Sequence, residues 1–299
     1  MSPQRPVLVA SDLSAGSDLA VSRGMVLAAA QQAPLVVLNA IEEEPLWWVL
    51  MSREVDADLV KADLRREALA SLAEQIRQTA DSQGMDSPSA DARVRFGKPV
   101  EQVAGAGEDM QAALIVVGAH GRHAVNDWFV GTTAEKLVRA SRRPVLLARI
   151  EPTHSYQHVV VGIDFSAASR AALVAALAQA PAAQVTLVHA YETWFESYLD
   201  PITYERLRSQ HEDTLRDRLR DFAREAGVET RHEPDYRVVA GLPGKELVDT
   251  ASRQHADLTV CGTRGETGLR HLLLGSVAQH VLRESKSDVL TVHPPAETD

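Results

Sequence analysis

VVGAHGRHAVNDWFVGTTAEKLV, residues Val116 to Val138, recurs in altered form as TVCGTRGETGLRHLLLGSVAQHVL, residues Thr259 to Leu282. Each stretch runs from an apolar, β-rich segment through a loop into a helix-like segment, and each has the spacing G-x-x-G-x9-G-[ST]. The glycines recur 144 residues apart, as Gly118, Gly121 and Gly131 in the first stretch and Gly262, Gly265 and Gly275 in the second. This constant spacing indicates a duplicated unit.

The duplication extends over the whole chain. VLVASDLSAGSDLA (Val7 to Ala20) aligns with VVVGIDFSAASRAA (Val159 to Ala172), which matches Asp12 with Asp164. In each copy, β-rich runs alternate with segments of helical apolar spacing, a pattern that predicts an α/β fold with a parallel sheet covered on both faces. The polar segment EPTHSYQ, residues 151–157, separates the copies. We therefore predict one domain at residues 1–150 and a second at 157–299.

Composition excludes several classes of partner. The 299 residues carry a net charge of −10, which argues against nucleic acid and against anionic membrane surfaces as partners. No apolar run approaches the roughly 18 residues that a membrane helix needs. The first residues do not resemble a signal or transit peptide. The single cysteine, Cys261, cannot form an intramolecular disulfide and suits a reducing compartment. We therefore expect a cytoplasmic protein.

The glycine motif predicts an anion-binding site. Open α/β sheets bind ligands beyond the carboxyl ends of their strands, and Gly118 and Gly262 each follow a predicted strand. Glycine there allows backbone angles closed to other residues and a close approach of ligand. The third glycine precedes Thr132 or Ser276, which open a helix whose free N–H groups and dipole favour phosphate. Two alternatives stay open, because such glycines also serve ordinary turns, and Asp12 and Asp164 suit either a ribose or adenine contact or a helix cap.

Both copies resemble the universal stress protein family, and the whole chain resembles its tandem form. GTRGETGLRHLLLGS, VGIDFS and DVLTVHP carry the resemblance, which is to the ATP-binding branch. It implies a Rossmann-like, five-stranded parallel sheet in the order 3-2-1-4-5 in each domain, sandwiched by helices. It also implies ATP as ligand, with Mg²⁺ as a candidate companion ion, and two sets of binding residues. These are Asp12, Ala40, Gly118, Gly121, Gly131, Thr132 and Thr133 in the first domain, and Asp164, Ala190, Gly262, Gly265, Gly275, Ser276 and Val277 in the second.

The two copies differ in their match to the family. Members commonly have an Asp before the fourth strand; Asp257 supplies it in the second copy, whereas Ala113 stands in the first. The first loop also holds Asp127, whose charge would repel a triphosphate, while Arg264 stands between the second set of glycines. We therefore expect the second domain to bind ATP more tightly.

Other candidate features favour a structural interpretation. GLPGKE (Gly241 to Glu246) lacks the full phosphate-loop pattern, and we read it as a helix start. His120 with His123, and His154 with His158, lack further metal ligands nearby in the sequence, so we predict surface histidines and no metal site. Aromatic residues that follow the second strand of each copy fit a cover of the sheet edge, a flap or a contact between copies; they are Trp47, Trp48, Trp194, Phe195 and Tyr198.

The final strands, Val145–Arg149 and Val289–His293, are β-rich, and in dimers of this family such strands pair across a twofold axis. The resemblance therefore implies an intramolecular pseudo-dimer, with a further homodimer as an additional state. We expect a stress-response or signalling protein that acts through nucleotide-linked conformation and an unidentified protein partner, without catalytic residues. The alternatives are a slow ATPase or nucleotide-transferring enzyme, and a scaffold whose first domain holds no nucleotide.

Overall fold

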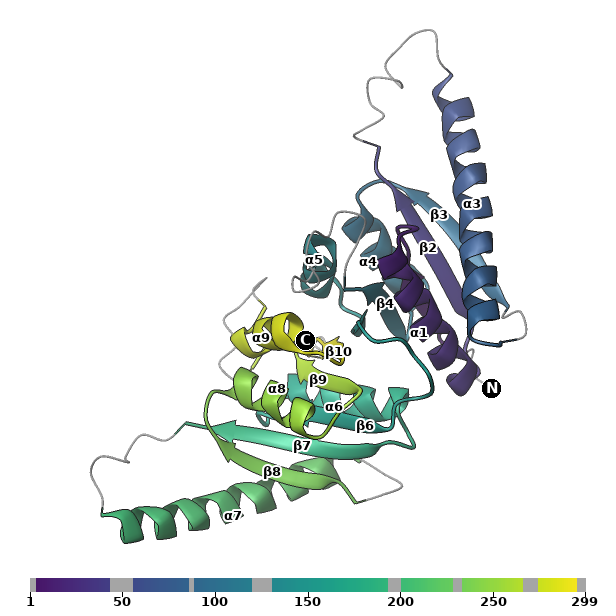
Figure 1. The fold of residues 1–299 in the computed structure, drawn as a ribbon. Helices are drawn as coiled ribbons and strands as arrows, with labels where there is room; N and C mark the ends of the chain where they lie inside the picture. The colour runs from purple at the N-terminus through teal and green to yellow at the C-terminus, as the bar shows by residue number, and fades with distance from the viewer. Residues whose placement is uncertain are drawn as a thin grey trace. The chain divides into compact units, whose positions relative to one another are not determined.

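The computed structural model describes residues 4–43, 56–85, 89–119, 131–192, 200–227, 233–265 and 274–294. Contacts divide the chain into two compact units, Met1–Ser155 and Tyr156–Asp299. We refer to them as the first and the second domain and describe each by itself (Figure 1). Within the described residues, no helix combines enough length with enough hydrophobicity to cross a bilayer.

The first domain alternates strands and helices. Its strands, all parallel, follow the spatial order β3-β2-β1-β4-β5. The elements are β1 (Val7–Ala10), α1 (Ala15–Gln31), β2 (Leu35–Ile41), α3 (Ala57–Ser82), β3 (Ala90–Phe96), α4 (Pro99–Asp109), β4 (Leu114–Gly118), α5 (Thr132–Ala140) and β5 (Val145–Ala148).

The second domain repeats this order as β8-β7-β6-β9-β10, again with parallel pairs. Both sheets therefore confirm the predicted order 3-2-1-4-5. The elements are β6 (His158–Gly162), α6 (Ala167–Gln179), β7 (Gln184–Tyr191), α7 (Pro201–Glu225), β8 (Asp235–Ala240), α8 (Pro243–Arg253), β9 (Leu258–Gly262), α9 (Ser276–Glu284) and β10 (Asp288–Val292).

The strand order explains why the central strands are apolar throughout. The chain winds outward from β1 to β3, returns across the sheet to β4 and continues to β5, so right-handed crossovers place α1 and α3 on one face and α4 and α5 on the other. With both faces covered, β4 is buried along its whole length. The reversal lies between β1 and β4, where the connections leaving the two strands diverge and leave room for a ligand.

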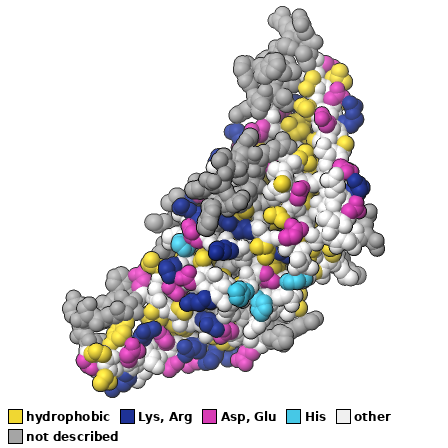
Figure 2. Space-filling model, viewed as in Figure 1, with side chains coloured by type: hydrophobic (Ala, Val, Ile, Leu, Met, Phe, Trp, Pro, Cys, Tyr) yellow, Lys and Arg dark blue, Asp and Glu magenta, His cyan; other side chains and the backbone are white. Residues whose placement is uncertain are grey.

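Helices α3 and α7 are the longest, at 26 and 25 residues, and each extends past the strands beside it (Figure 1). On α7, aspartates pair with arginines three residues later, as Asp213 does with Arg216 at 2.6 Å and Asp217 with Arg220 at 2.8 Å. Acidic and basic side chains are likewise mixed on the face shown in Figure 2. Paired surface charges of this kind are typical of a solvated helix rather than a nucleic-acid-binding one.

The polar segment after β5 is held on the first domain. Arg23 of α1 is buried and its Nη1 donates to the carbonyl of His154 at 3.3 Å, while Gln83 after α3 donates to Glu151 at 2.8 Å. The Nδ1 atom of His154 lies 2.8 Å from the carbonyl oxygen of Ser155. The segment is thus hydrogen-bonded to α1 and to the residue after α3, and the His154 side chain contacts the backbone of its neighbour Ser155.

Candidate functional site

Asp12 and Asp164 lie just beyond the carboxyl ends of β1 and β6. The Oδ1 atom of Asp164 accepts hydrogen bonds from the backbone N–H of Ser166 at 3.0 Å and from its hydroxyl at 2.6 Å. Asp12 accepts the equivalent pair from Ser14. The N-cap residues of α1 and α6 are Ser14 and Ser166, so the helix-cap interpretation of the aspartates is wrong. Each carboxylate is instead oriented by the capping serine that follows it.

The third glycine of each motif is held close to the end of the preceding strand by one backbone hydrogen bond. Gly131 N–H donates to the carbonyl of Ala119 at 2.8 Å, and Gly275 N–H donates to the carbonyl of Thr263 at 2.9 Å. Ala119 and Thr263 are in turn hydrogen-bonded to the ends of β5 and β10. Each glycine loop is therefore closed at its neck and fixed to the carboxyl edge of its sheet.

Close approach, rather than unusual backbone angles, explains the glycines of the second motif. None of Gly262, Gly265 and Gly275 has a left-handed φ, so the expected use of angles closed to other residues is wrong there. A Cβ on Gly275 would lie 3.3 Å from the carbonyl oxygen of Thr263. A Cβ on Gly262 would lie 2.8 Å from the Cβ atom of Ala168, so the absence of a side chain at Gly262 lets β9 pack against the start of α6.

Gly265 brings the motif to the first-strand carboxylate. A Cβ on Gly265 would lie 3.0 Å from Oδ2 of Asp164, the oxygen that does not bind Ser166. The structure thus places two sequence-predicted residues, 101 positions apart in the chain, against each other. A ligand that contacts the loop at Gly265 can reach this oxygen.

The helices after the loops begin without a side-chain cap. Gly131 and Gly275 are the N-cap residues of α5 and α9, and neither helix start has a side-chain cap hydrogen bond. Thr132 and Ser276, the first helical residues, are exposed, and Thr133 and Val277 follow them. Free first-turn N–H groups, the helix dipole and a nearby hydroxyl together favour an anion at each helix start.

The second strands reach the same edge, and Ala40 and Ala190 are the second-to-last residues of β2 and β7. The residue before each alanine ties the strands together: Asn39 Nδ2 donates to the carbonyl of Ser11 at 2.8 Å, and His189 Nδ1 lies 2.8 Å from that of Ile163. Burial lowers the pKa of His189, so the imidazole is neutral and donates through Nδ1. Sequence reasoning missed this pair, although the 150-residue spacing of the two strands would have matched them.

Some predicted features lie outside the described residues. They are Gly121, Asp127, His120, His123 and the aromatic residues 47, 48, 194, 195 and 198. Among the described parts of the chain, no group of three His, Cys, Asp or Glu side chains is placed to hold a metal ion. Cys261 is a free, buried thiol, and burial raises its pKa to about 12, which keeps it protonated and unreactive.

Asp257 lies at the opposite edge of the sheet from the glycine loops. Its carboxylate accepts the backbone N–H groups of Gln157 at 2.8 Å and His158 at 3.1 Å, where β6 begins. The backbone N–H of Asp257 also donates to the carbonyl of His158, as Ala113 N–H does to that of Pro6 in the first domain, so the carboxylate bonds are additional in the second domain. The difference between Asp257 and Ala113 therefore concerns how the start of the first strand is held, at the edge away from the glycine loops.

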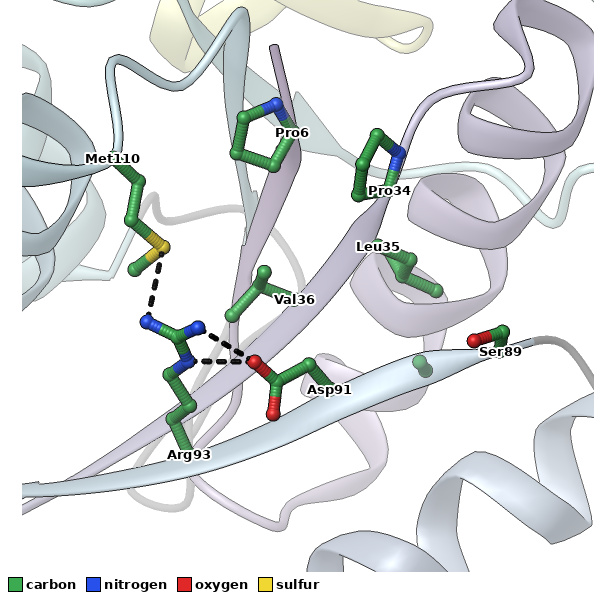
Figure 3. A pocket seen from close by; sticks show the side chains of 9 residues that line it. Pro6, Pro34, Leu35, Val36, Ser89, Asp91, Arg93 and Met110 are labelled. Carbon is green, nitrogen blue, oxygen red and sulfur yellow. Dashed lines mark hydrogen bonds and ion pairs between the residues drawn. The ribbon is translucent and has the colours of Figure 1, made fainter. Parts of the chain in front are cut away.

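A hollow of about 490 Å³ also opens at this opposite edge, in the first domain, where β1, β2 and β3 begin (Figure 3). Arg93 pairs with Asp91 at 2.7 Å across its floor, and its Nη1 lies 3.6 Å from the sulfur of Met110. None of the predicted binding residues lines it. Arg93 is the one cation that lines the hollow, and it is already paired with Asp91.

The chain thus has the architecture of the doubly wound α/β proteins, whose ligand sites lie beyond the carboxyl ends of the strands. The family model of the universal stress proteins matches residues 4–149 and again 155–293. The chain therefore belongs to the universal stress protein family, in its tandem form.

Individual relatives agree over the full length. A universal stress protein of Mycobacterium tuberculosis is 28% identical over 298 residues, which cover 96% of each chain. The crystal structure of a universal stress protein from Archaeoglobus fulgidus matches with a TM-score of 0.63 at 19% identity, over 97% of this chain and 99% of that one. One from Pseudomonas aeruginosa matches with a TM-score of 0.61 at 18% identity, over 97% and 94%. The two structures support the tandem fold.

Proposed function

We propose that this protein binds ATP at the carboxyl edge of each domain and acts in stress response or signalling through nucleotide-linked conformation and partner binding. The contact between Gly265 and Asp164 is the observation that carries the proposal, because it joins the glycine loop to the first-strand carboxylate. The triphosphate lies on the loop and at the start of α5 or α9, with Mg²⁺ as a candidate companion. The ribose and adenine lie toward Asp12 or Asp164 and toward Ala40 or Ala190.

The proposal includes slow or absent hydrolysis. Backbone N–H groups and hydroxyls hold phosphate but do not activate water, which requires a positioned general base. An ATPase or an AMP-transferring enzyme is the competing proposal. A multiple-turnover phosphate and pyrophosphate assay separates the two: sustained turnover on the order of 1 s⁻¹, as in ordinary enzymes, would contradict a role in binding alone.

We also propose that the second domain holds the tighter site. Arg264 stands within its motif, whereas Asp127 stands within the first. The scaffold alternative, in which the first domain holds no nucleotide, is the extreme form of this difference. The cytoplasmic location and the intramolecular pseudo-dimer stay predictions, the latter testable by small-angle scattering of the full chain.

The test is calorimetric titration of the full chain with ATP, after mass spectrometry of any nucleotide released from the purified protein. Gly275→Val should remove most high-affinity binding, because a side chain there crowds the carbonyl of Thr263 and widens the loop neck. Gly131→Val, the matched variant in the first domain, should leave that binding largely intact. If Gly131→Val removes the tight site and Gly275→Val spares it, the ranking of the domains is wrong. If the wild-type chain binds no ATP, the proposal fails.

A further inference from the structure

Helices α3 and α7 can be aligned residue by residue through their buried sides. Pairs of buried residues 143 positions apart define the match, namely Leu72 with Leu215, Ile76 with Leu219 and Ala80 with Ala223. This match pairs Gln75 with Arg218, and Thr79 with Phe222. Both Gln75 and Arg218 face the loop that follows the first strand, so they occupy the same place beside the two proposed nucleotide sites.

In the first domain this place is filled by a polar network. Gln75 is buried, its Oε1 accepts from the Ser11 hydroxyl at 2.6 Å, and its Nε2 donates to Asp18 at 2.6 Å and to Ser17 at 3.1 Å. The only formal charge in the network is the negative one of Asp18. The amide is fully engaged and is not available to a ligand.

In the second domain the same place holds an arginine stacked on aromatic rings. The guanidinium carbon of Arg218 lies 3.9 Å from the ring centre of Phe165, the residue directly after Asp164. Phe165 in turn contacts His189 at 4.5 Å and Phe222 at 5.6 Å between ring centres. Arg218 is therefore held at the carboxyl edge. It lies over Phe165, which follows Asp164, and Phe165 contacts His189, which precedes Ala190.

The charge at the first turn of the helix after the first strand also differs between the domains, because it is negative in the first and positive in the second. Arg170 matches Asp18 at the first turn of the helix and lies over the ring of Phe222 at 4.5 Å. Its charge is offset by Glu225, 3.1 Å away. Arg218 differs, because within the described residues no carboxylate lies within ion-pair distance of it, whereas Arg216, Arg220 and Arg224 each pair with an aspartate on α7. Arg218 is thus a cation at this edge whose charge no ion pair within the described residues offsets.

We propose that Arg218 strengthens the preference of the second domain for charged nucleotides over neutral nucleosides, a contribution that the first domain lacks because Gln75 stands at the matched place. This inference rests on the proposed nucleotide binding at the carboxyl edge. Arg218 is exposed, and an exposed cation attracts phosphates without direct contact over about a Debye length, roughly 10 Å at 0.1 M salt. The attraction grows with ligand charge and is screened by salt, which separates it from stacking on the base.

The experiment compares ATP, AMP and adenosine in titrations of the full chain at 50 mM and 500 mM salt. Arg218→Gln should weaken tight ATP binding roughly fivefold at the lower salt, AMP less and adenosine not at all. Arg218→Lys loses the stacking geometry of the guanidinium but keeps the charge, and because the attraction depends on charge it should stay within about twofold of wild type. Arg224→Gln removes an equal charge nearer the end of the same helix, where Asp221 already offsets it, and should change little.

Each outcome has a defined meaning. Equal losses for ATP and adenosine in Arg218→Gln, or a loss that high salt does not reduce, overturn the inference, because Arg218 would then act on the base or the fold. Wild-type affinity for ATP in Arg218→Gln also overturns it. A wild-type chain that binds none of the three ligands refutes the proposed function itself. Circular dichroism of each variant checks that the fold is intact.

Discussion

The two domains build the same backbone at the loop after the first strand but fill the space behind it differently. Leu13 and Phe165 both adopt a left-handed φ, 62° and 65°, and in both domains a side chain of the second strand bonds the carbonyl that precedes the loop aspartate. Behind this shared frame, the first domain places hydrogen-bonded polar groups and the second places packed rings. Local hydrogen bonds and caps therefore fix the loop, while the packing behind it is free to diverge.

This divergence has energetic consequences of different kinds. A buried polar network is stable only while every donor and acceptor has a partner, because each orphaned group costs about 1–3 kcal/mol. Packed rings depend on volume instead, and their removal leaves a cavity. The same position in the two domains should thus respond differently to the same substitution.

The largest expected effect is that of Phe222→Ala. Phe222 is 5% exposed and packs against Phe165, so truncation should destabilise the second domain by about 3 kcal/mol or more. The matched Thr79→Ala removes fewer atoms from the first domain and should cost about 1 kcal/mol. Peptide-resolved hydrogen exchange on the full chain reads the two domains separately. Equal losses in both would show that the rings of the second domain contribute no special packing.

The second effect concerns two glycines of one motif. In Gly262→Ala the new methyl group would lie 2.8 Å from Cβ and 3.1 Å from the carbonyl carbon of Ala168, so β9 or α6 must shift, at about 1–3 kcal/mol. In Gly265→Ala the neighbour is one carboxylate oxygen of the half-buried Asp164, which can rotate away, so stability should barely change.

Binding should show the reverse order for these two variants. Gly265→Ala displaces the proposed nucleoside-binding carboxylate and should weaken ATP binding more than it weakens the fold. Parallel thermal unfolding and ATP titration of both variants make the check. A Gly265→Ala protein with normal affinity would separate Asp164 from the proposed site.

The sequence predicted the repeat and the elements that carry the motif, because glycine spacing and apolar runs are local signals. The strand order was predicted only through the resemblance to the family. Helices α5 and α9 begin at Thr132 and Ser276, as expected. Strand β3, Ala90–Phe96, is harder to predict, because it lies at the edge of the sheet and alternates polar with apolar residues. Such alternation gives no continuous apolar run to detect.

Contacts between distant segments could not be predicted in the same way. Asp257 precedes β9, and its role depends on lying beside the start of β6. The role of Gly262 depends on how closely α6 packs against β9. Arg218 looks in the sequence like one more arginine on a charged helix. Only the register of α7 against the loop separates it from Arg216 and Arg220, whose partners lie on the helix itself.

The smallest effect is a pH dependence confined to the second domain. Burial lowers the pKa of His189 below its ordinary value near 6.5, so the folded domain holds a neutral imidazole while the unfolded chain takes up a proton near pH 6.5. The contribution of His189 to stability is therefore complete above pH 6.5. It is lost progressively as the pH falls from there toward the lowered folded pKa.

His189→Asn introduces the residue found at the matched place in the first domain, where Asn39 makes the same hydrogen bond without a titrating group. The variant should keep the bond to Ile163 and lose the acid sensitivity, so that exchange protection of β7 changes less than in wild type between pH 7.5 and 5.5, after correction for the intrinsic exchange rate. Asn39→His is the converse variant and should make β2 acid-sensitive. If the exchange protection of β7 changes equally with pH in the wild-type and His189→Asn proteins, His189 is not the group that titrates on unfolding. The two domains would then not differ in pH response at this position.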